Sequence, residues 1–261
     1  MHRLQIETLG PIVHVQLARP EKLNALDAQT FADLAAAGDQ LQTLRSCRAV
    51  VLSGAGRGFC SGIDLETLQA AGSGGERGLD IAKPFRGAAN LVQHVVLQWR
   101  ELPMPVIAAV HGVAYGGGLQ LALGADLRIV HPETRLAVME VKWGLIPDMA
   151  GMALLRELLR PDLHAELVWT ARTFDGSEAL RLGLATRLAT EPLAAAMELA
   201  GEIAARSPDA VRAAKRLLNL RGSRDELLRA EAAEQTALIG RPNQHEAVAA
   251  GLAKRAPQFE D

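Results

Sequence analysis

The chain has 261 residues, a formal net charge of -2 and 49% hydrophobic residues, so it can bury a large core as one domain, with or without a small appendage. Dispersed basic residues exclude a nucleic-acid footprint, and the apolar runs are far shorter than the roughly 18 residues that span a bilayer. Because the chain starts without an apolar segment and has only two cysteines and seven scattered histidines, we expect a cytoplasmic protein without a metal site or a disulfide framework.

The first part of the chain repeats a strand, a glycine-rich loop and a helix. Residues 12–17 alternate apolar and polar side chains, which predicts a strand. A helix is expected to start near Asn24 or Asp27, and residues 48–52 predict a second strand that enters the glycine-rich loop 53–65. This order of elements indicates an α/β protein.

Residues 106–120 hold the strongest signal for a binding site. Five apolar residues at 106–110 predict a buried strand, three glycines follow at 116–118, and a helix opens near Leu119. The first amides of such a helix can hold a phosphate or a negative carbonyl oxygen. The P-loop pattern fails at Gly118-Leu119, and the dinucleotide pattern fails at Leu121. The alternative is a glycine turn that only packs the helix against the strand.

The remaining elements predict a change of architecture near residue 190. Residues 70–78 predict a glycine-rich flap, 85–101 a long helix, 126–130 a strand and 135–141 a shorter one. A further helix is expected from about Gly151 until Pro161 closes it. Beyond Ser177 the pattern is helical, over 177–183, 191–206, 208–220 and 224–239. We therefore divide the chain into a mixed core, 1–190, and a helical region, 191–261.

Several short motifs become specific through their order and spacing. They are Asn24-Ala25-Leu26, the stretch from Phe59 to Leu65, His111-Gly112 with Gly116-Gly117-Gly118, Ala125 to Arg128, Glu140 with Gly144 to Asp148, Thr170 to Arg172, Glu178-Ala179 with Gly183-Leu184, and Pro208 with Lys215. Together they resemble the crotonase superfamily of enoyl-CoA hydratases and isomerases over nearly the whole chain. The resemblance implies a spiral of repeated ββα units with two roughly perpendicular sheets, and a C-terminal helical region that assembles a homotrimer or a dimer of trimers.

The resemblance also implies a binding site for an acyl-CoA thioester, with no other cofactor. An oxyanion hole would consist of the backbone N–H groups of Ile63 and Gly117, which stabilise the negative oxygen of an enolised thioester. Relatives place basic side chains near the CoA phosphates, and Arg19 and Lys22 occupy that region, although both could be solvated loop charges. The implied substrate contacts are Lys22, Ala25, Ser61, Gly62, Asp64, Leu65 and Gly116.

The two family positions for catalytic carboxylates carry Gln120 and Glu140 here. A glutamine amide cannot act as a general base, so Gln120 either orients water or substrate or has a structural role. Glu140 lies among apolar residues, which we expect to raise its pKa. Asp148 occupies a position where dienoyl-CoA isomerases carry a second acid. It could be catalytic, cap the following helix or line the pocket mouth.

This inventory favours double-bond isomerisation of an enoyl-CoA, with Glu140 moving the proton. The alternatives are an enoyl-CoA hydratase and a catalytically silent acyl-CoA-binding protein. Further residues have plain structural explanations: Cys60 as a buried filler and His111 as a hydrogen-bonded histidine. Tyr115 and Trp143 shape the acyl pocket or pack in the core, and Lys215 reaches CoA or faces solvent.

Overall fold

The computed structural model describes residues 2–72 and 80–261, so most of the flap predicted at 70–78 lies outside the described residues. Its centre is a six-stranded sheet that is parallel except for the first strand, which pairs antiparallel with the second. In spatial order the strands are β1 (Leu4–Leu9), β2 (Ile12–Leu17), β3 (Ala49–Gly54), β4 (Val106–Val110), β6 (Leu127–Val130) and β8 (Arg187–Leu188). A second, two-stranded parallel sheet joins β5 (Val113–Tyr115) to β7 (Arg135–Ala137).

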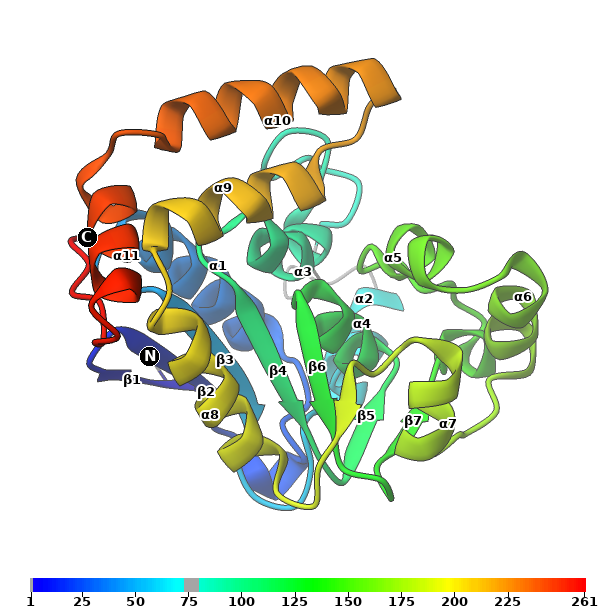
Figure 1. The fold of residues 1–261 in the computed structure, drawn as a ribbon. Coiled ribbons are helices and arrows are strands. Elements are labelled where there is room, and N and C mark those ends of the chain that lie inside the picture. Colours follow the sequence, from blue (N-terminus) through cyan, green and yellow to red (C-terminus); the bar gives the residue numbers. More distant parts are fainter. Residues whose placement is uncertain (1, 73–79) are drawn as a thin grey trace.

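Helices cover both faces of the six-stranded sheet because its central strands are apolar on both sides. Val50 and Leu52 of β3 face the main core, which α1 (Ala28–Thr43), α3 (Leu91–Glu101) and α4 (Gly117–Gly124) help to build. Ala49 and Val51 alternate with them and face α8 (Pro192–Ala204) on the other side. Figure 1 shows α8 in front of the sheet and α1 behind it. The predicted α/β class is confirmed.

Three predicted boundaries were wrong, each for a local reason. The helix expected over 85–101 begins only at Leu91, because the Asn90 side chain accepts the Gln93 N–H and caps α3 there. The strand expected over 135–141 ends at Ala137, and Glu140–Trp143 forms a short 3-10 helix, η2. Pro161 does not close a helix. It opens α6 (Pro161–Thr170), after α5 (Gly151–Leu158) has ended.

The C-terminal helices follow the predicted breaks closely. They are α7 (Gly176–Leu182), α8, α9 (Pro208–Asn219), α10 (Arg224–Leu238) and α11 (Pro242–Leu252). In Figure 1, α10 runs alongside α9 on the outside of the molecule, and none of its residues is buried. The division at residue 190 stays a prediction, since α8 belongs to the C-terminal region in sequence but packs on the sheet.

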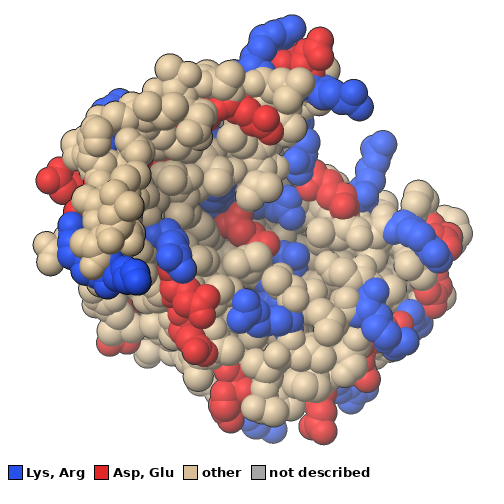
Figure 2. Space-filling model, viewed as in Figure 1, with Lys and Arg blue, Asp and Glu red and all other residues tan. Residues whose placement is uncertain are grey.

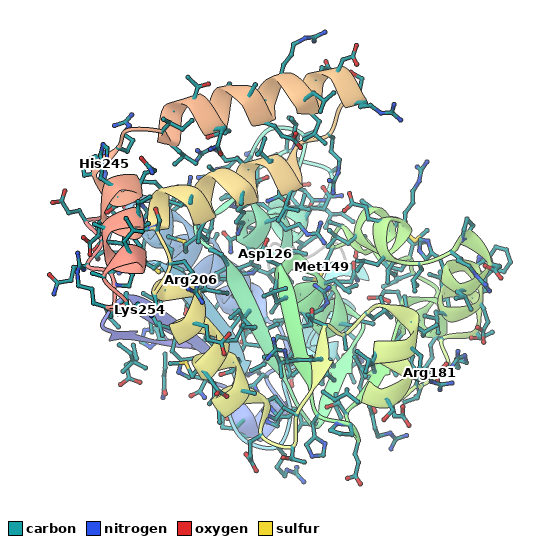
Figure 3. The ribbon with its side chains drawn as sticks, viewed as in Figure 1. Asp126, Met149, Arg181, Arg206, His245 and Lys254 are labelled. Atoms are coloured by element: carbon teal, nitrogen blue, oxygen red, sulfur yellow. The ribbon has the colours of Figure 1, made fainter. Side chains whose placement is uncertain are left out.

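Lys215 anchors α9 to the core, which corrects both of its expected roles. Its buried ammonium group donates hydrogen bonds to the carbonyl oxygens of Trp99 and Met104 and to Oδ2 of Asp126, at 2.7 to 2.9 Å. Asp126 lies on the inner side of α9 in Figure 3. Burial lowers the pKa of Lys215, and the nearby Asp126 carboxylate opposes that effect. Lys215 therefore neither reaches a ligand nor faces solvent.

Candidate active site

A cavity of about 450 Å³ opens where the two glycine-rich loops meet η2. Both predicted N–H donors, Glu140 and all the implied substrate contacts line it, whereas Gln120 and Asp148 do not. Tyr115 and Trp143 also line the cavity, which agrees with a role in shaping the acyl pocket. Glu66, Met139 and Leu145 line it as well, although no role was predicted for them. The lining residues are Lys22, Ala25, Ser61, Gly62, Ile63, Asp64, Leu65, Glu66, Tyr115, Gly116, Gly117, Met139, Glu140, Trp143 and Leu145.

The loop before α1 holds the first glycine-rich loop in place. Asn24 is buried and has a left-handed backbone, with φ of 56°. Its side-chain amide donates to the carbonyl oxygens of Ala55 and Gly58, both at 2.9 Å, and accepts the Arg19 N–H. Ser61 N–H adds a bond to the Leu23 carbonyl oxygen at 2.9 Å. Asn24 therefore connects the two loops through hydrogen bonds rather than contacting a ligand.

Ile63 presents a backbone N–H group at the cavity wall. Leu26 bonds the residues on either side of it: Leu26 N–H donates to the Gly62 carbonyl at 2.8 Å, and Asp64 N–H donates to the Leu26 carbonyl at 3.0 Å. The Ile63 N–H has no hydrogen-bond acceptor among residues 2–72 and 80–261. Gly62 has φ of +96°, and a Cβ there would lie 2.7 Å from the Tyr115 carbonyl oxygen, so only glycine fits.

Gly117 presents a second N–H group from the other loop. It is the first residue of α4, and within the described parts of the chain its N–H also has no acceptor. Gly62 lies so close to Gly117 that a Cβ on Gly62 would be 3.5 Å from the Gly117 nitrogen. Because Ile63 follows Gly62, the two N–H donors lie in the same part of the cavity. A Cβ on Gly117 would lie 2.7 Å from Sδ of Met149, whose side chain lies beside α4 in Figure 3. Gly118 instead packs against the Cys60 backbone, so it fits the packing explanation.

Glu140 is a buried carboxylate of the cavity, with 8% of its surface exposed, and unlike the buried Asp64 it is not paired with an arginine in the described part of the chain. Its Oε1 accepts a 2.5 Å hydrogen bond from Nε2 of Gln120, and its Oε2 is buried without a partner among the residues described. Burial raises the pKa of Glu140, the Asp148 carboxylate also raises it, and the Gln120 hydrogen bond lowers it. A carboxylate with one occupied and one unoccupied oxygen is suited to accept a proton.

Gln120 uses both ends of its side chain within the protein. Its Oε1 accepts the Gly151 N–H at 2.8 Å, and its Nε2 faces Glu140. Since a backbone N–H is only a donor, this bond fixes which end of the amide meets the carboxylate. The side chain is 2% exposed. Gln120 therefore contacts Glu140 and lies behind the cavity wall.

Asp148 does not have the two minor roles considered for it. Ala150, rather than Asp148, is the N-cap of α5, and the side chain that accepts the first N–H of that helix, at Gly151, is Gln120. Asp148 is also not among the residues that line the cavity. Burial raises the pKa of its carboxyl group, and its charge in turn raises the pKa of Glu140. Asp148 therefore influences Glu140 electrostatically, and its catalytic role stays a prediction.

The basic residues near the cavity differ in what they can bind. Arg19 is 12% exposed and pairs with Asp64 at 2.6 Å, so it is not available to an external phosphate. Burial would raise the pKa of Asp64, but the hydrogen bond from Arg19 leaves it lowered. Lys22 is 51% exposed at the cavity, and its ion pair among the described residues is with Glu66, at 3.6 Å. Lys22 is therefore the better of the two expected phosphate contacts.

Two residues beside the loops have structural roles. Nε2 of His111 lies 2.9 Å from the Gly56 carbonyl oxygen, which agrees with a hydrogen-bonded histidine. Cys60 is fully buried, and burial raises the pKa of its thiol to about 12, so it is no nucleophile.

Other kinds of site find no support in the described residues. No group of three His, Cys, Asp or Glu side chains there could hold a metal ion. No helix in residues 2–72 and 80–261 is both long and apolar enough to cross a membrane. Figure 2 shows acidic and basic side chains interspersed over the visible face, without a field of one sign.

Comparison with known proteins assigns the family. The profile described as enoyl-CoA hydratase/isomerase matches residues 7–261. A carnitinyl-CoA dehydratase of Proteus mirabilis is 37% identical over 218 residues, which cover 82% of this chain and 79% of that protein. A peroxisomal Delta(3,5)-Delta(2,4)-dienoyl-CoA isomerase of Arabidopsis thaliana is 32% identical over 262 residues, covering 97% of this chain and 94% of the relative.

Solved structures agree with these sequence relatives. The crystal structure of an enoyl-CoA hydratase from Polaromonas sp. JS666 superposes with a TM-score of 0.89 at 28% identity, covering 98% of this chain and 99% of that one. The chain is an enzyme of the enoyl-CoA hydratase/isomerase family and belongs to the crotonase superfamily.

Proposed function

We propose that this enzyme moves the double bond of an enoyl-CoA thioester from C3 to C2, with Glu140 as its single proton-transfer group. The observation that carries the proposal is the Glu140 carboxylate: the residue lines the cavity, Gln120 occupies Oε1, and the buried Oε2 has no partner among the described residues. Gln120, which stands where hydratases of this family have a second acid, has both polar ends engaged and cannot exchange a proton.

The proposed reaction runs through an enolate. The thioester oxygen accepts hydrogen bonds from the N–H groups of Ile63 and Gly117. The Glu140 carboxylate removes a proton from C2, and the electron pair of that C–H bond spreads through the thioester as a dienolate. The same proton then goes to C4, so the C3–C4 double bond becomes single and a C2–C3 double bond forms. No atom is gained or lost, and Glu140 returns to its ionised form.

Hydration is the rival that this geometry disfavours. Adding water to C3 needs a group that positions and deprotonates the water while another proton reaches C2. The Gln120 carbonyl that might accept from a water already accepts the Gly151 N–H. Glu140 would have to perform both tasks alone, which supports isomerisation as the faster reaction.

A second candidate is a dienoyl-CoA isomerase, the activity named for the Arabidopsis relative. Asp148 favours it, because its carboxyl group lies close enough to raise the pKa of Glu140 and its own pKa is raised. A proton shift over a longer conjugated chain would use Asp148 as the second acid. Against it stands the position of Asp148 outside the residues that line the cavity.

The substrate assignment rests on the shape and charge of the cavity. Ala25, Leu65, Met139, Trp143 and Leu145 offer an apolar lining for the acyl chain, and Lys22 offers a cation for a CoA phosphate. We also infer assembly into a homotrimer or a dimer of trimers, because α10 buries none of its residues in a single chain and leaves Leu228 54% exposed. No cofactor besides the CoA of the substrate enters the proposal.

Product analysis tests the proposed reaction against its rivals. The enzyme is incubated separately with 3-enoyl-CoA, 2-enoyl-CoA and 3,5-dienoyl-CoA, and the products are separated and weighed by mass spectrometry. Isomerisation predicts conversion of the 3-enoyl ester without change of mass. Faster gain of one water by the 2-enoyl ester would contradict it in favour of hydration. Preferred turnover of the dienoyl ester would favour the second candidate, and no turnover of any ester would leave a silent acyl-CoA binder.

A further inference from the structure

Arg19 and Asp64 form a buried ion pair directly beside the Ile63 donor. Nη1 of Arg19 lies 2.6 Å from Oδ2 of Asp64, and the two side chains are 12% and 6% exposed. Asp64 follows Ile63 in sequence, yet its carboxylate is turned toward Arg19. The other carboxylate oxygen, Oδ1, accepts the Glu66 N–H at 2.9 Å, so both oxygens are held within the protein.

One nitrogen of Arg19 joins the two loops that carry the donor. Nη1 donates to the Ala25 carbonyl oxygen at 3.2 Å as well as to Asp64. Ala25 and Asp64 flank the backbone pairing of Leu26 with Ile63, in which Leu26 bonds Gly62 and Asp64. The Arg19 guanidinium therefore adds hydrogen bonds on the same side as the Leu26–Ile63 pairing. Together these bonds fix the distance between the loop 60–66 and the loop 19–27.

The ion pair is itself fixed to α1. Asp27, the N-cap of α1, accepts the Thr30 N–H at 2.8 Å and lies 3.5 Å from Nη1 of Arg19. Arg3 pairs with the same Asp27 oxygen, Oδ2, at 2.7 Å. Two arginines and two aspartates thus share this network, and the exposed carboxylate of Glu21 lies 3.9 Å from Nε of Arg19. The network connects the packed helix α1 to the Ile63 segment.

We propose that Arg19 and Asp64 are positioning residues that hold the Ile63 N–H where it meets the enolate oxygen. The inference rests on the proposed function, since it gives the Ile63 N–H that task. Donors to a developing oxyanion act only when they are preorganised at hydrogen-bond distance, and a misplacement of about 1 Å is costly. Loosening this pair therefore weakens enolate stabilisation more than it weakens ground-state binding of the ester.

A 3-ketoacyl-CoA ester provides a direct probe of that task. Such an ester ionises to an enolate whose near-ultraviolet absorbance reports how strongly the site stabilises the negative oxygen. For Arg19→Met and Asp64→Asn we expect the bound enolate to form only at higher pH than in the wild type. We also expect kcat on the 3-enoyl ester to fall about 10- to 100-fold, with KM changed less than about 3-fold, and Arg19→Lys to recover part of the loss.

The controls separate positioning from folding. Arg19→Met leaves the Asp64 charge buried without its partner, so the double variant Arg19→Met/Asp64→Asn, which carries no unpaired charge, is measured beside it. Arg216→Met removes an exposed ion pair to Glu234 between α9 and α10, and it is expected to leave the enolate absorbance unchanged. Thermal unfolding shows which variants remain folded.

Two results would overturn the inference in distinguishable ways. If the wild type binds the 3-ketoacyl-CoA without any enolate absorbance, the proposed function fails together with the positioning pair. If the wild type shows the absorbance and the folded double variant shows it at the same pH with unchanged kcat, the pair has only a structural role and the proposed function stands.

Discussion

The two walls of the cavity differ in what they are made of. One wall offers main-chain N–H groups, at Ile63 and Gly117, on loops where glycine permits close approach. The other offers one side-chain carboxylate, Glu140, held from behind by Gln120 and the Gly151 N–H. The N–H groups of the first wall can stabilise the negative oxygen of an enolate, whereas the proposed proton transfer takes place at Glu140 on the second wall. Substitutions should therefore affect the two walls in different ways.

The largest effect is expected at the proton-transfer wall, for Glu140→Gln. The amide keeps an acceptor for Gln120 but loses the basic oxygen, so turnover should fall about 10²- to 10⁴-fold while affinity for a saturated acyl-CoA ester is retained. Steady-state kinetics and calorimetric binding measure the two quantities. Retained turnover would show that another group is the base.

The same variant should be at least as stable as the wild type at neutral pH. Burial raises the folded-state pKa of Glu140, so its ionised form is less favourable folded than unfolded. That penalty is absent below the unfolded pKa and develops as pH rises through the folded pKa. Urea unfolding should thus show the stability difference between Glu140→Gln and wild type growing from acidic to neutral pH. A variant that is less stable at neutral pH would contradict this assignment.

A smaller effect is expected at the donor wall, for Gly117→Ala. The new Cβ would come within 2.7 Å of Sδ of Met149 and 3.4 Å of Leu26 Cδ1, so the donor must shift. Loss of one such donor costs about 10²- to 10³-fold in rate, and because the flexible Met149 can yield we expect about 10- to 100-fold in kcat. Gly201→Ala is the matched control, since a Cβ there meets nothing within 4 Å. Equal kinetics for both variants would mean that Gly117 has no role in catalysis.

The finest test uses two substitutions with opposite effects on the pH profile. Activity needs ionised Glu140, so kcat/KM should fall as pH drops through its pKa. Gln120→Met removes a hydrogen bond that lowers this pKa, so the acidic limb should move to higher pH. Asp148→Asn removes a charge that raises it, so the limb should move to lower pH, with activity at neutral pH within a few-fold of wild type. Shifts of the same sign in both variants would contradict the assignment of the limb to Glu140.

The sequence predicted the donor wall better than the proton-transfer wall. The strands at 12–17, 48–52 and 106–110 are locally encoded by alternation or by continuous apolar runs, and the glycines at 62 and 116–118 mark close approaches that only glycine allows. The strands β1, β5 and β8 were missed, because β1 is exposed over most of its length and β5 and β8, with three and two residues, are too short to show a period.

The role of Gln120 could not be predicted because it depends on a distant backbone group. Its amide orientation follows from the Gly151 N–H, 31 positions away and at the start of a helix whose N-cap, Ala150, has a left-handed backbone. Neither alternative left open for Arg19, a phosphate contact or a solvated loop charge, could reveal its ion pair, since nothing local shows that Asp64 lies 2.6 Å away. The sequence shows which polar and charged residues are present. Which of them bond to one another within the protein, and so are unavailable to a ligand, depends on tertiary contacts.

The most direct test of the one-base mechanism follows a label from C2. A 3-enoyl-CoA carrying deuterium at C2 is converted in a single turnover, and the position of deuterium in the product is read by mass spectrometry and NMR. With Glu140 as the single base, part of the deuterium is carried from C2 to C4, in the wild type and in Asp148→Asn alike. Product without any deuterium at C4, together with loss of turnover in Asp148→Asn, would contradict the one-base mechanism and would require two separate proton-transfer groups.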